Sequence, residues 1–248
     1  MIIDCVLSAC NLKQEYMDCI QFFIMAWKKL FPEVKILIIL IANKIPECLE
    51  QFTEHFILFD PIENISTAFI SQYIRILYPC LLNFDNGVII TDIDMVPMNR
   101  SFYIDNIKDI DNNKFIYYLK TSNNNQIVIC NNIAIPKIWK DIMNIHSIDD
   151  IKNRLIKEYP GDKYNDKYKR VHGWCRDQTD LYKYVIEWNL KTNNLIELGK
   201  VHRRIDRINF KITPETLEKI KKKEYDDFHI FRPPSRYLKI NRQIINLL

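Results

Sequence analysis

Glycine is scarce in this sequence: only four of the 248 residues are glycine, and none lies in a G-x-G-x-x-G or Walker loop. Such loops need glycine at fixed positions because a backbone without Cβ atoms can approach a phosphate group closely. Any phosphate ligand of this protein must therefore be held in another way. The same scarcity excludes collagen-like and linker-rich architectures.

Long apolar runs and paired cysteines are lacking as well. No run is long enough to span a bilayer, and the N-terminus, Met1-Ile2-Ile3-Asp4, lacks the basic segment that opens a signal peptide. The seven cysteines are odd in number, scattered and without a C-x-x-C pair. We therefore expect no zinc site and no transmembrane segment, but reduced thiols in a cytoplasmic protein.

A strong excess of charge is also absent. The formal net charge is only +4 and no dense basic stripe is present, so we expect no nucleic-acid partner. Hydrophobic residues make up 48% of the chain, which excludes disorder and suffices for one large domain over residues 1–248. The abundance of isoleucine, asparagine and lysine is typical of an AT-rich genome, such as that of a large DNA virus or a parasite.

Apolar segments alternate with helical patterns through the first ninety residues. We expect strands over residues 2–8, 34–42, 55–59 and 87–91, and helices over 12–30 and 67–78. This alternation predicts an α/β fold whose central sheet is mostly parallel and covered by helices on both faces. Residues 115–119 and 126–130 predict an antiparallel hairpin, so the sheet should be mixed. Further helices are expected over 147–159, over 177–188 and from residue 213.

Two carboxylates follow the strand at 87–91, in the segment Thr91-Asp92-Ile93-Asp94. In an extended chain, residues two apart point the same way, so Asp92 and Asp94 are expected to converge on one hard divalent cation. Such a cation can neutralise a diphosphate leaving group. The ends of strands are also where open α/β sheets bind their ligands.

Four other segments accompany this acidic pair. The first strand ends in Ser8-Ala9-Cys10-Asn11, with Tyr16 shortly after it, and Tyr73-Ile74-Arg75 lies in the helix before the acidic pair. Downstream come Asp177-Gln178-Thr179-Asp180 and the segment from Asp227 to Pro233, which contains His229 and Arg232. Together with D-x-D, these motifs resemble nucleotide-sugar glycosyltransferases of the GT-A fold, in particular the glycogenin-like and bacterial lipopolysaccharide galactosyltransferase-like families.

The resemblance implies a role for each matching residue. Residues 1–99 would form the nucleotide-sugar-binding half and residues 100–248 the acceptor-side half. The implied donor-binding residues are Ser8, Ala9, Cys10, Asn11, Tyr16, Arg75, Asp92 and Arg232. Asp92, Asp94 and His229 would ligate Mn²⁺ or Mg²⁺, and Asp177, Gln178 and Asp180 would face the reacting sugar and the acceptor. The implied reaction is transfer from a UDP-sugar to a hydroxyl acceptor with retention of configuration.

Two other interpretations stay open. The segment from Ile89 to Val96 also fits the h-h-h-D-x-D-x-V signature of haloacid-dehalogenase-like phosphatases, in which Asp92 would be the nucleophile. That motif normally opens its fold, however, whereas three strands are expected before it here. The second alternative is a catalytically inactive GT-A domain that only binds. The sugar, the acceptor and the oligomeric state are not specified by the sequence.

Overall fold

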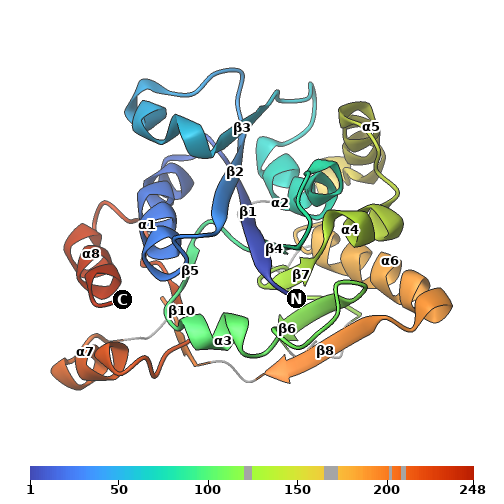
Figure 1. Ribbon diagram of the computed structural model, residues 1–248. Helices are drawn as coiled ribbons and strands as arrows, with labels where there is room; N and C mark the ends of the chain where they lie inside the picture. The colour runs from blue at the N-terminus through green and yellow to red at the C-terminus, as the bar shows by residue number, and fades with distance from the viewer. Residues whose placement is uncertain (120–124, 165–172, 201–202, 208–210) are drawn as a thin grey trace.

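A seven-stranded sheet forms the centre of the molecule (Figure 1). The computed structural model describes residues 1–119, 125–164, 173–200, 203–207 and 211–248. The sheet order is β3 (Phe56–Phe59), β2 (Lys35–Ile41), β1 (Ile3–Asn11), β4 (Gly87–Ile90), β7 (Asn132–Ala134), β6 (Phe115–Leu119) and β8 (Leu195–Lys200). Only β7 runs antiparallel to its neighbours β4 and β6. The prediction of a mixed, mostly parallel sheet is confirmed.

Helices cover both faces of this sheet. On one side lies α1 (Gln14–Leu30) and on the other lie α2 (Thr67–Leu77), α4 (Pro136–Met143), α5 (Ile148–Glu158) and α6 (Arg176–Thr192) (Figure 1). Strand β4 shows why, because Ile89 packs into the α1 core while Val88 and Ile90 pack into the opposite one. A strand that is apolar at every position must be covered on both faces.

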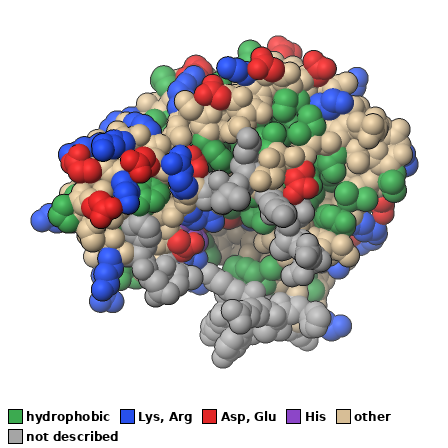
Figure 2. Space-filling view, turned by 90° about the horizontal axis from the view of Figure 1, so that it is seen from below, with side chains coloured by type: hydrophobic (Ala, Val, Ile, Leu, Met, Phe, Trp, Pro, Cys, Tyr) green, Lys and Arg blue, Asp and Glu red, His purple; other side chains and the backbone are tan. Residues whose placement is uncertain are grey.

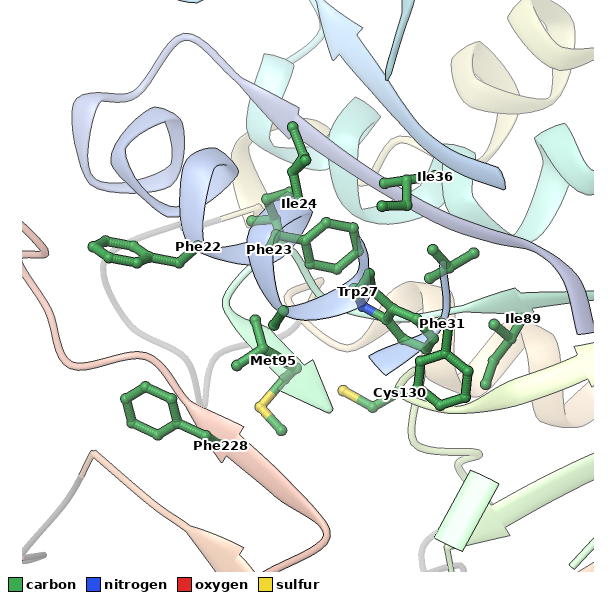
Figure 3. Packing of buried hydrophobic residues seen from close by; sticks show 14 of the residues in the cluster. Phe22, Phe23, Ile24, Trp27, Phe31, Ile36, Ile89, Met95, Cys130 and Phe228 are labelled. Atoms are coloured by element: carbon green, nitrogen blue, oxygen red, sulfur yellow. The ribbon is translucent and has the colours of Figure 1, made fainter. Parts of the chain in front are cut away.

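Aromatic side chains of α1 form the centre of one core. Trp27 lies 4.9 Å from Phe31 and 5.6 Å from Tyr103, measured between ring centroids. Tyr103 belongs to the short helix α3 (Arg100–Ile104). Figure 3 shows Trp27 and Phe31 beside Cys130 and Met95. Residues on both sides of the acidic pair are thus fixed in a closely packed core.

A second, three-stranded sheet brings the C-terminal part of the chain to the acidic pair. It contains β5 (Met95–Pro97), β10 (Asp227–His229) and β9 (Arg204–Ile205) in the order β5-β10-β9. The antiparallel pairing sets His229 opposite Met95. The backbone N–H of Ile230 donates to the carbonyl oxygen of Asp94 at 2.9 Å. Residues 135 positions apart in the sequence therefore become neighbours.

The remaining elements are short or peripheral. They are the 3₁₀ helices η1 (Glu47–His55), η2 (Tyr78–Leu81) and η3 (Gly161–Lys163) and the α-helices α7 (Pro214–Lys221) and α8 (Leu238–Asn246). Among the described residues, no helix is both long enough and apolar enough to cross a membrane.

One expected strand lies elsewhere. Residues 126–130 do not form a strand, and β7 begins at Asn132 instead. The Asn132 amide donates to the carbonyl oxygens of Val128 and Ile129 at 2.8 and 2.7 Å, and Asn131 adopts a positive φ of 64°. A turn stabilised by an asparagine side chain thus replaces the start of the expected strand. The antiparallel pairing with β6 that we expected is present.

Gly87 should be needed for the contact between β4 and its neighbours. A Cβ at this position would lie 2.4 Å from Cδ1 of Ile133 and 2.9 Å from the carbonyl oxygen of Ile2. We expect Gly87→Ala to lower the free energy of unfolding by about 1–3 kcal/mol, since overpacking a core forces its neighbours to move. Thermal unfolding measures this, with Asp85→Ala at an exposed position as control. Equal midpoints for the two variants would contradict the packing described.

Candidate active site

A cleft opens at the carboxyl ends of β1 and β4. The sheet order reverses between these two strands, because β2 and β3 extend from one side of β1 and β4 lies on the other. Such switch points are where open α/β sheets bind ligands. The cleft has a cavity volume of about 190 Å³, which is smaller than the roughly 300–1,000 Å³ of typical small-molecule sites. Figure 2 shows a hollow in one face of the molecule, with acidic and basic side chains beside it.

Most of the predicted site residues line this cleft. They are Ala9, Cys10, Tyr16, Arg75, Asp92, Asp94, Asp177, Gln178, His229 and Arg232. They come from the end of β1, the start of α1, the helices α2 and α6, the turn after β4 and the segment that begins with β10. The fold therefore brings together ten residues that are spread over most of the sequence.

A tight turn separates the two carboxylates of the acidic pair. The backbone N–H of Met95 donates to the carbonyl oxygen of Asp92 at 3.1 Å, so the chain is not extended between Asp92 and Asp94. Asp92 consequently points toward Arg75, and Asp94 points toward His229. The expectation that both side chains converge as in an extended strand is wrong for this reason.

Arg75 joins Asp92 to a second carboxylate. Its guanidinium forms a close ion pair with Asp92, and Nη2 lies 3.4 Å from Oδ2 of Asp177 on α6. The Sγ of Cys130 donates to the other oxygen of Asp92 at 2.7 Å. Arg75 is almost fully buried, and a buried guanidinium is stable only when it is paired. The ion pairs therefore fix the end of β4 against α2 and α6.

Burial and charge act in opposite directions on these two carboxylates. Burial would raise the pKa of Asp92, but the Arg75 charge and the hydrogen bonds from Cys130 and Arg75 together outweigh this effect, and the pKa is lowered. For Asp177 burial prevails over Arg75, and with the Asp92 charge nearby it raises the pKa to about 7. Asp177 therefore changes its protonation state near neutral pH, while Asp92 stays ionised.

Asp94 is surrounded by cationic side chains. Its Oδ2 accepts hydrogen bonds from Nη1 of Arg207 at 2.6 Å, from Nε2 of His229 at 2.8 Å and from Nη2 of Arg232. Burial would raise the pKa of Asp94, but the His229 hydrogen bond and the two guanidinium charges hold it well below its usual range. The guanidinium of Arg232 also lies 4.4 Å above the Tyr16 ring centre, in a cation–π contact.

The three expected metal ligands do not form a metal-binding group in this arrangement. Asp94 and His229 are adjacent, but Asp92 is turned toward Arg75 and Cys130. Within the described ranges, no three His, Cys, Asp or Glu side chains are grouped so that they could hold an ion. Moreover, two guanidinium groups already contact the Asp94 oxygen that would bind the ion.

Three predicted site residues do not line the cleft. The Ser8 hydroxyl donates to the carbonyl oxygen of Thr91 at 2.9 Å, and the Asn11 amide donates to the Thr67 hydroxyl at 3.2 Å. Asp180 accepts hydrogen bonds from the Tyr73 hydroxyl at 2.6 Å and from Nε of Arg176 at 2.8 Å. These side chains connect elements of the fold, and the donor-binding roles expected for Ser8 and Asn11 and the catalytic role expected for Asp180 stay predictions from the sequence.

The cleft also contains residues that the sequence reasoning missed. Arg207 lies outside every motif, so no sequence signal points to it. Ser71 and Gln72 lie one turn before Arg75 on the same face of α2, so helical spacing could have identified them. Trp174, which sequence reasoning left open between loop packing and sugar stacking, lines the cleft and lies nearly parallel to Tyr164 at 6.1 Å.

Comparison with known proteins yields fold relatives only. No protein-family model matches the sequence, and no curated protein does. A solved glycosyltransferase involved in the glycosylation of the major capsid of PBCV-1 matches with a TM-score of 0.50 and 10% identity over 98% of both chains. The chain has a GT-A fold.

Two other solved structures are similar over nearly the whole chain. The galactosyltransferase LgtC, in complex with donor and acceptor sugar analogs, has a TM-score of 0.49 and 12% identity, with 98% of this chain and 96% of that chain covered. The glycosyltransferase GlyE of Streptococcus pneumoniae TIGR4 has a TM-score of 0.49 and 13% identity, with 99% and 63% covered.

The raised pKa of Asp177 makes a testable contribution to stability. The unfolded chain releases this proton near pH 3.8 and the folded chain near pH 7, so ionisation destabilises the fold increasingly between these values and constantly above them. Because the substitution also removes an ion-pair partner of Arg75, we expect the pH dependence to carry the effect: relative to the wild type, Asp177→Asn should be more stable at pH 8 than at pH 5 by up to about 3 kcal/mol. Chemical denaturation at both pH values measures this. A gain that is equal at both pH values would contradict the buried, proton-binding Asp177.

The placement of Asp180 gives a matched comparison within the same helix. Asp180→Asn weakens two buried hydrogen bonds and should lower the free energy of unfolding by about 1–3 kcal/mol. Because Asp180 does not line the cleft, binding of UDP to this variant should equal that of the wild type. A loss of UDP binding in a folded variant would contradict this placement and support a role for Asp180 in the site.

Proposed function

We propose that this protein is a glycosyltransferase, which moves a hexosyl group from a nucleotide-sugar donor to a hydroxyl acceptor. The observation that carries the proposal is the cleft at the switch point of a GT-A fold, in which Asp92 and Asp94 lie among Arg75, Arg207 and Arg232. Such a cleft offers fixed cationic groups to a diphosphate and carboxylates to a sugar. Both are required when a nucleotide sugar reacts.

The donor is proposed to be a UDP-sugar, as the family resemblance implies. Ala9 and Cys10 at the end of β1 and the ring of Tyr16 supply a small, partly aromatic wall for a nucleoside. Arg232 lies over that ring and would meet the first phosphate beyond it. Arg75 and Asp92 line the same cleft and would contact the sugar.

The chemistry of the step follows from where charge develops. Departure of the nucleoside diphosphate creates negative charge on the β-phosphate oxygen, and a guanidinium such as that of Arg232 stabilises it. The anomeric carbon becomes oxocarbenium-like, and nearby carboxylates stabilise its positive charge. Under the retention that the resemblance implies, the departing phosphate oxygen accepts the proton of the acceptor hydroxyl. Asp177 and Gln178 would then bind the sugar and the acceptor.

Binding of Mn²⁺ or Mg²⁺ by Asp92, Asp94 and His229 stays a prediction from the sequence. It requires Asp92 to turn and the two arginines to leave Asp94, because the side chains as placed do not form such a site. No step above depends on the ion. Titration of the protein with Mn²⁺ by calorimetry, with Asp94→Asn for comparison, tests this prediction directly.

We also propose the remaining assignments made from the sequence. Residues 1–99 would bind the donor and residues 100–248 the acceptor, although Arg207, His229 and Arg232 from the second half reach the donor side of the cleft. A reducing compartment such as the cytoplasm is supported by the seven cysteines, which are all free. No acceptor is identified beyond a hydroxyl compound.

The phosphatase alternative is not favoured by the placement of a second acidic pair. Asp227 is held by Arg204 at 2.7 and 3.0 Å, and Asp226 accepts from the Asn99 amide and the Arg203 backbone. Neither residue lines the cleft with Asp92, where that mechanism would need them. Only an activity assay distinguishes a catalytically inactive binding domain from an enzyme.

The test is release of nucleoside diphosphate from a panel of UDP- and GDP-sugars, with water or simple sugars as acceptors. We expect release from at least one donor, and Asp92→Asn should reduce its rate at least 100-fold, as loss of a key polar group in an active site typically does. Asp85→Asn, at an exposed position just before β4, serves as the control.

Three readouts separate the alternatives. The anomeric configuration of the product, read by NMR, distinguishes retention from inversion. Metal-stimulated phosphate release from simple phosphate esters, without any reaction of nucleotide sugars, would instead support the phosphatase. Binding of a nucleotide sugar without any turnover would support the inactive domain.

A further inference from the structure

Two arginines share one carboxylate at the donor side of the cleft. Arg207 and Arg232 both donate to Oδ2 of Asp94, and His229 donates to the same atom. Asp94 can neutralise only one of the two guanidinium charges. Two other carboxylates lie close by: Glu15, which pairs with Lys13 at 2.9 Å, and Asp206, which lies 3.7 Å from Nδ1 of His229. The pair therefore presents a surplus of positive charge to the cleft.

The two guanidinium groups also have hydrogen-bond donors to spare. Each carries five N–H donors, and Asp94 accepts from Nη1 of Arg207 and from Nη2 of Arg232. Among the residues that the structure describes, the buried Nε of Arg232 has no hydrogen-bond partner, and a buried donor without an acceptor is costly. An anion with several oxygens would satisfy these donors, and guanidinium groups match phosphate oxygens in paired geometry.

The positions of both arginines are fixed by the protein. Arg232 lies over the ring of Tyr16, and Asp94 holds both groups from a rigid turn between β4 and β5. The side chains of Arg207 and Arg232 are only 17% and 13% exposed, so neither is a free surface residue. Little ordering is therefore needed when an anion binds.

We propose that Arg207 and Arg232 together hold the diphosphate of the donor directly, so that a nucleoside diphosphate binds without a divalent cation. The proposal rests on the proposed function and adds to it a residue, Arg207, that no motif contains. Asp94 acts here as a positioning residue, because it aligns the two guanidinium groups. A cation that the transfer step uses would add to this binding and would not create it.

The experiment is calorimetric titration of the full chain with UDP, GDP, inorganic diphosphate and uridine, each in excess EDTA and again with Mn²⁺. We expect one nucleoside diphosphate and inorganic diphosphate to bind in EDTA. Arg207→Gln should weaken both at least about 10-fold, since a charge-assisted hydrogen bond is worth about 1.5–3 kcal/mol. Uridine lacks phosphate, so its affinity should not change. Arg207→Lys, which keeps the charge but not the paired donors, should lie between Gln and wild type.

Arg236→Gln is the matched control, because it removes the same charge at an exposed position four residues from Arg232. Its affinities should equal those of the wild type, and circular dichroism verifies that each variant is folded. Binding of diphosphates that requires Mn²⁺ would overturn this proposal and leave the glycosyltransferase standing. Unchanged affinity in Arg207→Gln would overturn the role of Arg207. No binding of any nucleoside diphosphate under either condition would overturn the proposed function as well.

Discussion

The buried charge of Arg75 is the constraint on which the site depends. A guanidinium inside a protein needs carboxylate partners, and Arg75 finds them in Asp92 after β4 and in Asp177 on α6. The helix α2, the end of β4 and the start of α6 must therefore meet at one point. The same ion pairs lower the pKa of Asp92, whereas burial dominates at Asp177. Arg75 thus determines where these three elements meet and helps to keep Asp92 ionised.

The scarcity of glycine in the sequence corresponds to an abundance of arginine side chains in the cleft. A protein that lacks a glycine-rich loop must offer side chains to a phosphate, and here the cleft contains three arginines, Arg75, Arg207 and Arg232. Guanidinium groups keep their positive charge at any pH the protein meets, and they bind oxygen atoms in pairs. They need counter-charges when no ligand is present, and Asp92 and Asp94 supply them. The acidic pair therefore supplies part of the counter-charge of these three arginines, and positive charge remains in excess.

Sequence reasoning was most successful where the signal is local and repeated. The strands on both sides of α1 and the cap of α5 at Ser147 follow from apolar patterns and helix signals, and the mixed sheet was predicted. The predictions from the sequence failed where a single turn determines the direction of the chain. The turn after Asp92 separates the two carboxylates, and Asn132 displaces β7. Arg207 could not be predicted as a site residue, because only the pairing of β9 with β10 brings it close to Asp94. Ser8, Asn11 and Asp180 do not line the cleft, because proximity in sequence does not specify which way a side chain points.

The pairing of β10 with β5 has a consequence for the order of events during synthesis. His229 and Arg232 reach Asp94 only because β10 adds to a strand made some 130 residues earlier. The strands β1, β2 and β4 are complete when residue 90 has been made, whereas the partners of Asp94 come from residues 207, 229 and 232. During synthesis, Asp94 is therefore without its three partners long after Asp92 and Arg75 have both been made.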